Sequence, residues 1–255
     1  MKDKLTIVKV GGKIVEDESS LDVLLREFAA IEGFKLLVHG GGRSATAMAA
    51  RLGVETVMID GRRVTDSEML RIVTMVYAGS VNKNIVARLQ AMGVDALGMT
   101  GADMNIILSR KRAASPVDYG WVGDPVAVND GALASLLSAG VVPVVAPLTH
   151  DGEGHLLNTN ADTMAGTVAR GLAGRFDVSL IYCFEKPGVL RDEHDDASVI
   201  PVIDRGIFGT LRADGIVSGG MIPKIENALA AVDEGVAEVV ITAHNALASG
   251  TRIVL

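Results

Sequence analysis

The segment LLVHGGGRS, residues 36–44, decides the fold, because an apolar run ends there in three glycines and a helical pattern follows. A short run of Leu and Val without polar alternation is typical of a strand buried on both faces, as in a parallel sheet covered by helices. Three consecutive glycines lower stability, so their presence at a strand-to-helix turn implies a use. The same order recurs in LTIVKVGGK, residues 5–13, where a strand ends in two glycines.

Working outward from these turns, strands and helices alternate along the chain. We expect strands at Leu5 to Val10, Lys35 to His39, Val141 to Ala146, Val178 to Phe184 and Glu238 to Thr242. We expect helices at Ser20 to Ile31, Ser44 to Leu52, Ser67 to Met92, Asp130 to Ala139, Ala161 to Leu172 and Met221 to Glu234. This alternation predicts an α/β fold in three layers (αβα), with helices on both faces of an open, mostly parallel sheet.

Two features interrupt the alternation. Residues 95–129 contain short apolar runs with glycines at 120 and 123, which predict hairpins on one edge. The turn from Gly171 to Arg175 predicts a boundary near residue 175. We therefore expect an N-terminal lobe of residues 1–175 and a C-terminal lobe of residues 176–255.

Composition and charge narrow the class of protein. Of the 255 residues, 49% are hydrophobic and 22% are charged, which is usual for a globular protein. The formal charge of −7 argues against a nucleic-acid partner, since such a partner favours a basic face. No apolar run approaches the roughly 18 residues that a membrane-spanning helix needs. Cys183 is the only cysteine, which excludes an internal disulfide and predicts a reducing, cytoplasmic compartment.

The glycine turns are candidate anion sites, because ligands of open α/β sheets bind beyond the carboxyl ends of the strands. Backbone amides approach an anion closely where no Cβ intervenes, and Lys9 would add a charge to the same space. The first turn also fits an ordinary surface loop. Gly40, Gly42 and Ala45, with Asp60 downstream, loosely match a dinucleotide fingerprint, which leaves a nicotinamide-dependent oxidoreductase as an alternative. No phosphate-binding loop of the form G-x-x-x-x-G-K-[ST] occurs.

Three further clusters combine glycines with charged or amide side chains. GRRVT, residues 61–65, offers guanidinium groups suited to gripping a carboxylate at two points. NTNAD, residues 158–162, places an aspartate two residues after an asparagine that fits a helix N-cap. SGGMIPK, residues 218–224, is a glycine turn that leads into a helix with a lysine in its first turn. Taken singly, these clusters also fit a solvated turn, a helix cap and a helix start.

In combination, the motifs resemble those of the N-acetylglutamate kinases, a branch of the amino-acid kinase family, over essentially the whole chain. The resemblance is carried by KVGGK, HGGGR, GRRVT, VGD, NTNAD, PGVL and SGGMIPK, in that order. It implies an αβα sandwich with an eight-stranded sheet and two ligands, an acylated amino acid in the N-terminal lobe and ATP in the C-terminal lobe. The implied reaction, in arginine biosynthesis, transfers the γ-phosphoryl group of ATP, with Mg²⁺, to the side-chain carboxylate of N-acetyl-L-glutamate and yields an acyl phosphate.

The resemblance also implies roles for single residues. Lys9 and Lys224 would stabilise the transferring phosphoryl group, and Asp162 would orient both lysines. The residues that would hold the N-acylglutamate are Gly41, Gly42, Arg63 and Asn158. The residues that would lie along the nucleotide are Gly12, Phe184, Gly188, Val189, Leu190, Ile216, Gly219 and Gly220. No protein ligand of Mg²⁺ is implied, and phosphates with water would hold the ion.

Two positions depart from the family pattern. Residues 183–186 read CFEK where relatives commonly show threonine and aspartate, which leaves side-chain roles in that loop open. Arg62 replaces a residue that is commonly apolar, and an extra cation would suit a succinyl group on the acceptor. Because neighbouring strand residues face opposite ways, we instead expect Arg62 to meet solvent. A ligand-binding protein without catalysis is a further alternative, which the presence of both Lys9 and Lys224 disfavours.

The resemblance also bears on assembly. Relatives that arginine inhibits carry an extra helix ahead of the first strand, whereas here the first strand is expected near Leu5. We therefore expect a homodimer formed along the helix from Ser67 to Met92, without inhibition by L-arginine.

Overall fold

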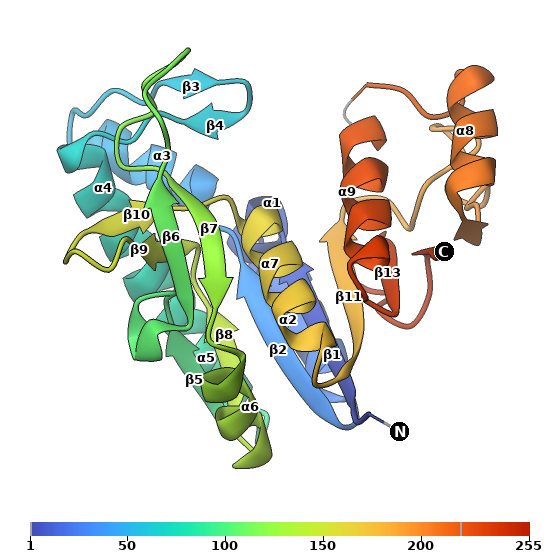
Figure 1. Cartoon of the computed structure of the whole chain (residues 1–255), viewed down its shortest axis with the longest axis horizontal. Coiled ribbons are helices and arrows are strands. Elements are labelled where there is room, and N and C mark those ends of the chain that lie inside the picture. The colour runs from blue at the N-terminus through green and yellow to red at the C-terminus, as the bar shows by residue number, and fades with distance from the viewer. Residues whose placement is uncertain (1, 220) are drawn as a thin grey trace.

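The computed structural model describes residues 2–219 and 221–255 and is built on one eight-stranded sheet (Figure 1). In spatial order its strands are β12 (Val202–Ile203), β14 (Thr251–Ile253), β13 (Glu238–Ala243), β11 (Asp177–Phe184), β1 (Lys4–Val10), β2 (Phe34–His39), β8 (Val142–Val145) and β5 (Ala96–Met99). Neighbouring strands are parallel except β13 and β14. The predicted open, mostly parallel sheet is confirmed, and all five predicted strands belong to it.

Helices cover both faces of this sheet, which confirms the three-layer αβα prediction. One face carries α1 (Gly12–Glu16), α2 (Glu18–Ala29), α3 (Gly42–Arg51), α4 (Ser67–Thr74), the π-helical segment η1 (Met75–Val81) and α5 (Asn82–Ala91). The other face carries α6 (Asp130–Ser138), α7 (Ala161–Ala173), α8 (Arg205–Ala213) and α9 (Met221–Asp233). Each face has its own apolar core, because every long strand is buried on both sides.

Strand alternation decides which side chains meet which helices. In β1, Leu5 and Ile7 join the core under α7, whereas Val8 and Val10 join the core under α2. By the same period of two, Lys9 points toward α7. In β2 the parity places His39 on the opposite face, toward α5. Two polar side chains at strand ends are therefore directed to opposite layers.

Smaller sheets cover the carboxyl edge beside β2 and β8. One contains β6 (Ile107–Lys111), β7 (Gly123–Val128), β9 (Leu148–His150) and β10 (Leu156–Asn158), and the short 3₁₀ turn η2 (Asp103–Asn105) precedes β6. The other is a hairpin of β3 (Met58–Ile59) and β4 (Arg62–Arg63). Isolated bridges join Thr65 to Gly120 and Val122 to Asn158, so these pieces meet at one place.

Two expectations are corrected. Residues 96–99 were expected among the edge hairpins but form β5 of the main sheet, because they pair with β8, which follows much later in the chain. The expected helix from Ser67 to Met92 is divided by η1, where π-helical bonding replaces the α pattern. The remainder of the predicted hairpin region does form β6 and β7, which pair antiparallel.

The predicted lobe boundary falls between α7 and β11. There β11 pairs with β1 over seven residues, from Lys4–Asp177 to Val10–Cys183, so the sheet runs through it unbroken. Both apolar cores also contain residues from either side of residue 175. The division into two lobes therefore stays a prediction, namely that each lobe binds a different ligand. Across the described ranges, no helix has the length and apolar character to cross a membrane.

Candidate functional site

The two glycine turns lie against each other at the carboxyl edge of the sheet. The Gly40 amide donates to the Val10 carbonyl at 2.9 Å. A Cβ on Gly40 would lie 3.1 Å from the Gly12 nitrogen, which is tighter than most real contacts. A Cβ on Gly12 would lie 3.6 Å from the Gly42 nitrogen and 3.8 Å from the Gly41 nitrogen. The glycines therefore let amides from both turns face one shared space, as anion binding requires.

This space belongs to a first cavity of about 200 Å³, lined by residues of the two glycine turns, the β3–β4 hairpin, η1 and the start of α7. It brings together Gly12, Gly41, Gly42, Arg63, Asn158, Lys9 and Asp162, all of which the sequence singled out. Residues as far apart in the sequence as Lys9 and Asp162 thus line one cavity. Sequence reasoning missed its aromatic wall, Tyr77, which comes from the π-helical segment; such segments are frequent at functional sites.

Arg63 is a buried cation of the first cavity, with 8% of its surface exposed. Its Nη2 donates to the Gly42 carbonyl and to Thr46 Oγ1, each at 2.8 Å. Its Nη1 donates to Thr56 Oγ1 at 3.2 Å. These bonds fix the plane of the guanidinium and tie β4 to the glycine turn at the start of α3. Arg63 therefore helps to shape the site as well as charging it.

Asn158 enters the cavity from the end of β10. Its Nδ2 donates to Thr65 Oγ1 at 2.9 Å, and Thr65 Oγ1 donates to the Arg63 carbonyl at 3.1 Å. Thr65 is fully buried, so this chain of bonds is shielded from water. The GRRVT and NTNAD motifs are consequently locked to each other.

Lys9 and Asp162 form the central ion pair, with 2.7 Å between Nζ and Oδ1. Lys9 is only 6% exposed, and a buried ammonium without a partner would be strongly destabilising. Asp162 lies in the first turn of α7, where the helix dipole favours a carboxylate. The predicted cap is confirmed, since the Asn160 side chain accepts a hydrogen bond from the Thr163 amide at 3.0 Å. The cap sets where α7 begins and so where Asp162 stands.

Two further cavities lie on the side of the C-terminal strands. A second cavity of about 570 Å³ is lined by Asp162, Phe184 and Lys224, among others. A third, of about 280 Å³, is lined by Gly12, Phe184, Gly188 and Lys224. Asp162 thus joins the first cavity to the second, and Gly12 joins the first to the third.

Lys224 faces the same region as Lys9. Its Nζ lies 3.8 Å from the centroid of the Phe184 ring, and the Lys9 Nζ lies 5.4 Å from that centroid. Partial burial lowers the pKa of Lys224, and the positive charge of Lys9 lowers it further, whereas Asp162 and Glu185 oppose the shift. Two ammonium groups facing one ring make a cationic region that suits phosphate oxygens.

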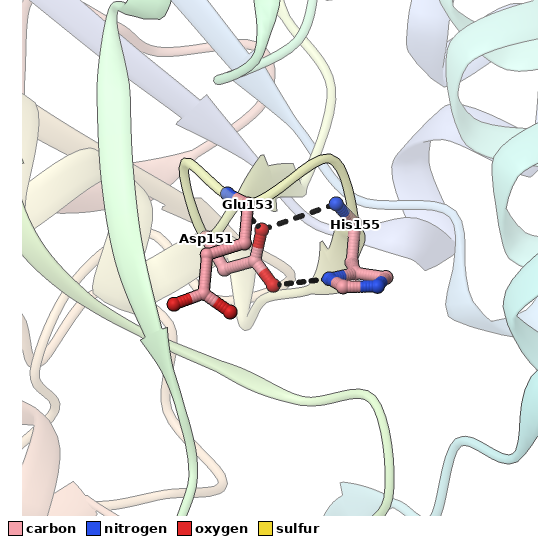
Figure 2. Close-up of side chains that lie close together, drawn as sticks. All are labelled: Asp151, Glu153 and His155. Carbon is pink, nitrogen blue, oxygen red and sulfur yellow. Dashed lines mark hydrogen bonds and ion pairs between the residues drawn. The ribbon is translucent and has the colours of Figure 1, made fainter.

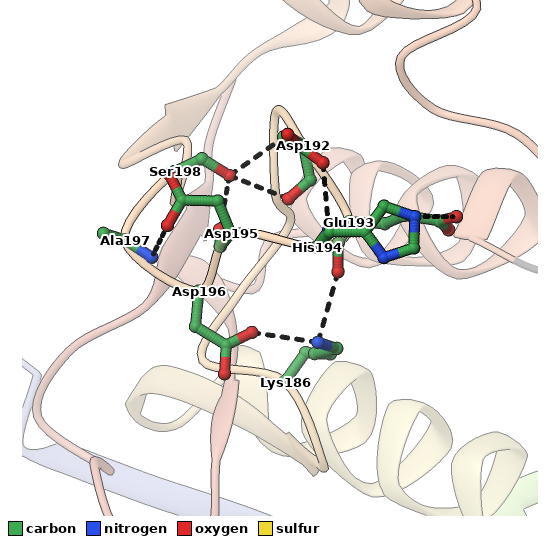
Figure 3. Close-up of polar contacts among 8 residues, drawn as sticks. All are labelled: Lys186, Asp192, Glu193, His194, Asp195, Asp196, Ala197 and Ser198. Carbon is green, nitrogen blue, oxygen red and sulfur yellow. Dashed lines mark hydrogen bonds and ion pairs between the residues drawn. The ribbon is translucent and has the colours of Figure 1, made fainter.

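The altered loop after β11 is held by its own ion pairs. Lys13 of α1 pairs with Glu185, which links the first glycine turn to this loop. Lys186 donates to Asp196 Oδ1 at 2.9 Å and to the Glu193 carbonyl at 3.2 Å, within the acidic segment of Figure 3. In the unusual CFEK segment, Glu185 and Lys186 are therefore paired within the protein. Phe184 of the same segment supplies the ring that Lys9 and Lys224 face.

Not every predicted nucleotide residue lines these cavities. Val189 is 2% exposed, its side chain packs in the core, and its amide donates to Thr251 Oγ1 at 2.8 Å. Leu190, Ile216 and Gly219 lie outside the three cavities as well. Gly220 lies outside the described residues. The assignment of these five positions to the nucleotide stays a prediction.

Arg62 differs from its expected placement. It is half-buried and lines both the first and the second cavity rather than simply facing solvent. The expectation that Arg62 meets solvent assumed a sheet with one core face and one solvent face. The β3–β4 hairpin instead has only two residues per strand, and both Arg62 and Arg63 line the first cavity. Asp60, which the dinucleotide fingerprint would place on a ribose, lies in the turn of this hairpin with a positive φ of 48°.

A separate group of potential metal ligands lies on the β9–β10 turn (Figure 2). Asp151 accepts hydrogen bonds from the Glu153 amide at 2.8 Å and from the His155 ring Nδ1 at 2.7 Å. These contacts are internal to the turn and account for its shape. None of the three residues lines the cavities that hold Lys9 and Lys224.

Comparisons with known proteins point to one family. The family model described as the amino acid kinase family matches residues 4–243. The chain is 64% identical to an acetylglutamate kinase of Phocaeicola vulgatus, over 100% of this chain and 99% of the relative. It is 62% identical to that of Bacteroides fragilis, over 99% and 98%.

Solved structures share the fold. The crystal structure of smu.665 from Streptococcus mutans UA159 has a TM-score of 0.79 at 28% identity and covers 98% of both chains. An N-acetylglutamate synthase from Neisseria gonorrhoeae has a TM-score of 0.82 at 22% identity, over 98% of this chain and 59% of that one. The motifs, the sheet and these matches lead to one conclusion: the chain belongs to the amino-acid kinase family.

Proposed function

We propose that this chain is an acylglutamate kinase that transfers the γ-phosphoryl group of ATP to the side-chain carboxylate of N-acetyl-L-glutamate in arginine biosynthesis. The observation that carries the proposal is that the Lys9–Asp162 pair links the first cavity to the second, which Lys224 also lines. The names of the relatives support the choice of acceptor.

The chemistry needs charge neutralisation rather than a proton acceptor. A side-chain carboxylate has a reference pKa of about 4.3 and is already an ionised nucleophile at neutral pH. One of its oxygens bonds to the γ-phosphorus, and the bond from that phosphorus to the β–γ bridging oxygen breaks, so ADP leaves with the electron pair. Lys9 and Lys224 neutralise the charge that grows on the transferring group, and Asp162 orients the lysines.

The acceptor would lie in the first cavity. Arg63 and the amides of Gly41 and Gly42 suit its carboxylates, and Asn158 suits the acylamino group. The β3–β4 hairpin, which carries Arg63, lines one side of this cavity. This arrangement would bring the reacting carboxylate toward Lys9.

ATP would occupy the other two cavities, with its phosphates near Gly12 and Lys224 and its base toward the segment from Phe184 to Leu190. We also propose that Ile216, Gly219 and Gly220 lie along the nucleotide. The first 175 residues would then serve the acceptor and residues 176–255 the nucleotide. The continuous pairing of β1 with β11 supports a fixed distance between the two.

The reaction would use Mg²⁺, held mainly by the phosphates and water. The carboxylates that line the cavities are Asp60, Asp162 and Glu185. Two of them are engaged with lysines, Asp162 with Lys9 and Glu185 with Lys13. This donor set fits a metal that enters with the nucleotide better than a resident ion. The metal neutralises phosphate charge, and the protein residues position the two substrates.

We also propose a cytoplasmic homodimer that forms along α4 and α5. Met75, in η1 between these two helices, supports this surface, because 57% of it is exposed. Sedimentation equilibrium should give the mass of two chains, and a monomer would contradict the assembly without affecting the chemistry.

The function is tested by trapping the acyl phosphate with hydroxylamine while ATP, Mg²⁺ and an acceptor are supplied. N-acetylglutamate, N-succinylglutamate and glutamate form parallel arms, because Arg62 lines the acceptor cavity. We expect hydroxamate and ADP in equal amounts, greatest with N-acetylglutamate. A change in nicotinamide absorbance, or ADP without hydroxamate in every arm, would overturn the proposal.

The paired lysines generate the first prediction. Lys9→Ala or Lys224→Ala should lower kcat by roughly 10²–10³, since each removes one electrostatic donor from the transition state. The KM values should change much less. Lys111→Ala, in a strand away from the cavities, is the matched control and should keep normal turnover. Near-normal kcat in either site variant would sink the assignment.

A second prediction concerns pH. Protonated Lys224 is the active form, so activity falls as pH rises through its lowered pKa. Asp162 raises that pKa, so Asp162→Asn should lower it further and move the alkaline decline of kcat/KM to lower pH. Glu153→Gln, on the β9–β10 turn, should leave the profile in place. A shift of the decline to higher pH would contradict the electrostatic account.

A third prediction concerns Arg63. Arg63→Ala should mainly raise the KM for the acceptor, because it removes a carboxylate clamp and releases the Gly42 carbonyl. Arg63→Lys should restore binding only in part, since an ammonium cannot bond Gly42, Thr46 and a carboxylate in one plane. Arg51→Ala, exposed on α3, is the control. An equal rise in the KM for ATP would show that the acceptor has been misplaced.

A further inference from the structure

His39 is a buried titratable group that the chemistry above does not use. It is the last residue of β2, is fully buried, and points toward α5 rather than into the first cavity. The turn that follows it supplies Gly41 and Gly42 to that cavity. A polar ring with no exposed surface requires partners, and its partners show what it holds.

The ring has one partner on each nitrogen. His39 Nδ1 lies 2.8 Å from the Gly40 carbonyl oxygen, and Nε2 lies 3.0 Å from Asn82 Nδ2. Asn82 is 1% exposed, and the same Nδ2 donates to the Val144 carbonyl at 2.9 Å. The chain of bonds therefore runs from β8 through α5 to the glycine turn.

This network determines the tautomer of His39. The Val144 carbonyl can only accept, so it fixes which end of the Asn82 amide is the NH₂ group. The second hydrogen of that group points at Nε2, which must accept. Nδ1 therefore carries the proton and donates to the Gly40 carbonyl. Burial lowers the pKa of His39 to about 4, and Lys83 lowers it in the same direction although the Gly40 carbonyl opposes it, so the ring stays neutral under working conditions.

The orientation of a carbonyl sets the orientation of the next amide. The Gly40 carbonyl and the Gly41 N–H belong to one planar trans peptide, so they point in opposite directions. His39 holds the carbonyl on the α5 side. The Gly41 nitrogen lies 3.8 Å from where a Cβ on Gly12 would be, on the side of the shared anion space. Glycine at position 40 has no Cβ to restrict this peptide, so without His39 its plane would be free to rotate.

We propose that His39 and Asn82 are positioning residues, which aim the Gly41 amide at the oxygens of the acceptor. The inference rests on the proposed kinase function. Val144 supports Asn82, Asn82 fixes the tautomer of His39, and His39 orients the peptide. Neither residue touches a substrate.

Two substitutions at His39 separate the two bonds. Asparagine places an N–H near the position of Nδ1, so His39→Asn keeps the bond to Gly40 and loses Asn82. Glutamine reaches the position of Nε2, so His39→Gln keeps Asn82 and loses Gly40. Misplacement of a catalytic group by about 1 Å lowers rates about 100-fold, which is the loss in kcat expected for His39→Gln. His39→Asn should retain most of the kcat, and His194→Gln, on an exposed loop, is the control.

A measurement on the wild-type protein makes the test independent of folding of the variants. Long-range ¹H–¹⁵N spectra should show His39 protonated at Nδ1 only, and the Gly41 amide resonance should shift when N-acetylglutamate binds. An Nε2–H tautomer, an unmoved Gly41 resonance in a complex that forms, or equal losses in both variants would overturn the inference. If the wild-type protein yields no acyl phosphate, the proposed function fails. The spectra still report the tautomer of His39 in that case, so the two failures are distinguishable.

Discussion

The structure depends first on a lysine buried at the end of a central strand. Lys9 reaches the carboxyl edge of the sheet on the α7 face, where its charge is tolerable only beside a carboxylate. Asp162 supplies that carboxylate because the Asn160 cap starts α7 at the right place. The ion pair therefore connects the central strand β1 to α7, and its carboxylate lines both the first and the second cavity. An ammonium held this way is available to an incoming anion without prior reorganisation.

The second constraint is the close approach of the two glycine turns. β1 and β2 are adjacent and parallel, so both turns emerge at the same edge, and the absence of side chains lets their amides share one space. Arg63 fixes the far side of the second turn through the Gly42 carbonyl, and His39 fixes the near side through the Gly40 carbonyl. The anion site is thus rigid although it is built from glycine, because side chains from β2 and from the β3–β4 hairpin hold its backbone.

Much of this could be predicted from the sequence, for reasons visible in particular residues. Apolar runs that end in glycine revealed β1 and β2, and the order of the motifs revealed which positions meet. β5 was missed because its pairing with β8 is a long-range contact and a glycine interrupts its apolar run. The π-helical segment was invisible, so Tyr77 was missed with it. Arg62 was expected to face solvent because the size of the β3–β4 hairpin was unknown. The Asn82 bond to His39 joins α5 to β2 and has no local signature.

The most direct test of the central claim is a crystal structure with N-acetylglutamate, ADP, Mg²⁺ and a planar fluoride mimic of the transferring phosphoryl group. The account predicts that the mimic lies where the first and second cavities meet at Asp162, with the Nζ atoms of Lys9 and Lys224 both within hydrogen-bond distance of its fluorine atoms. It also predicts that Asp162 still pairs with Lys9 and does not bind the metal. A mimic bound away from either lysine, or Asp162 bound to Mg²⁺ in place of Lys9, would contradict it.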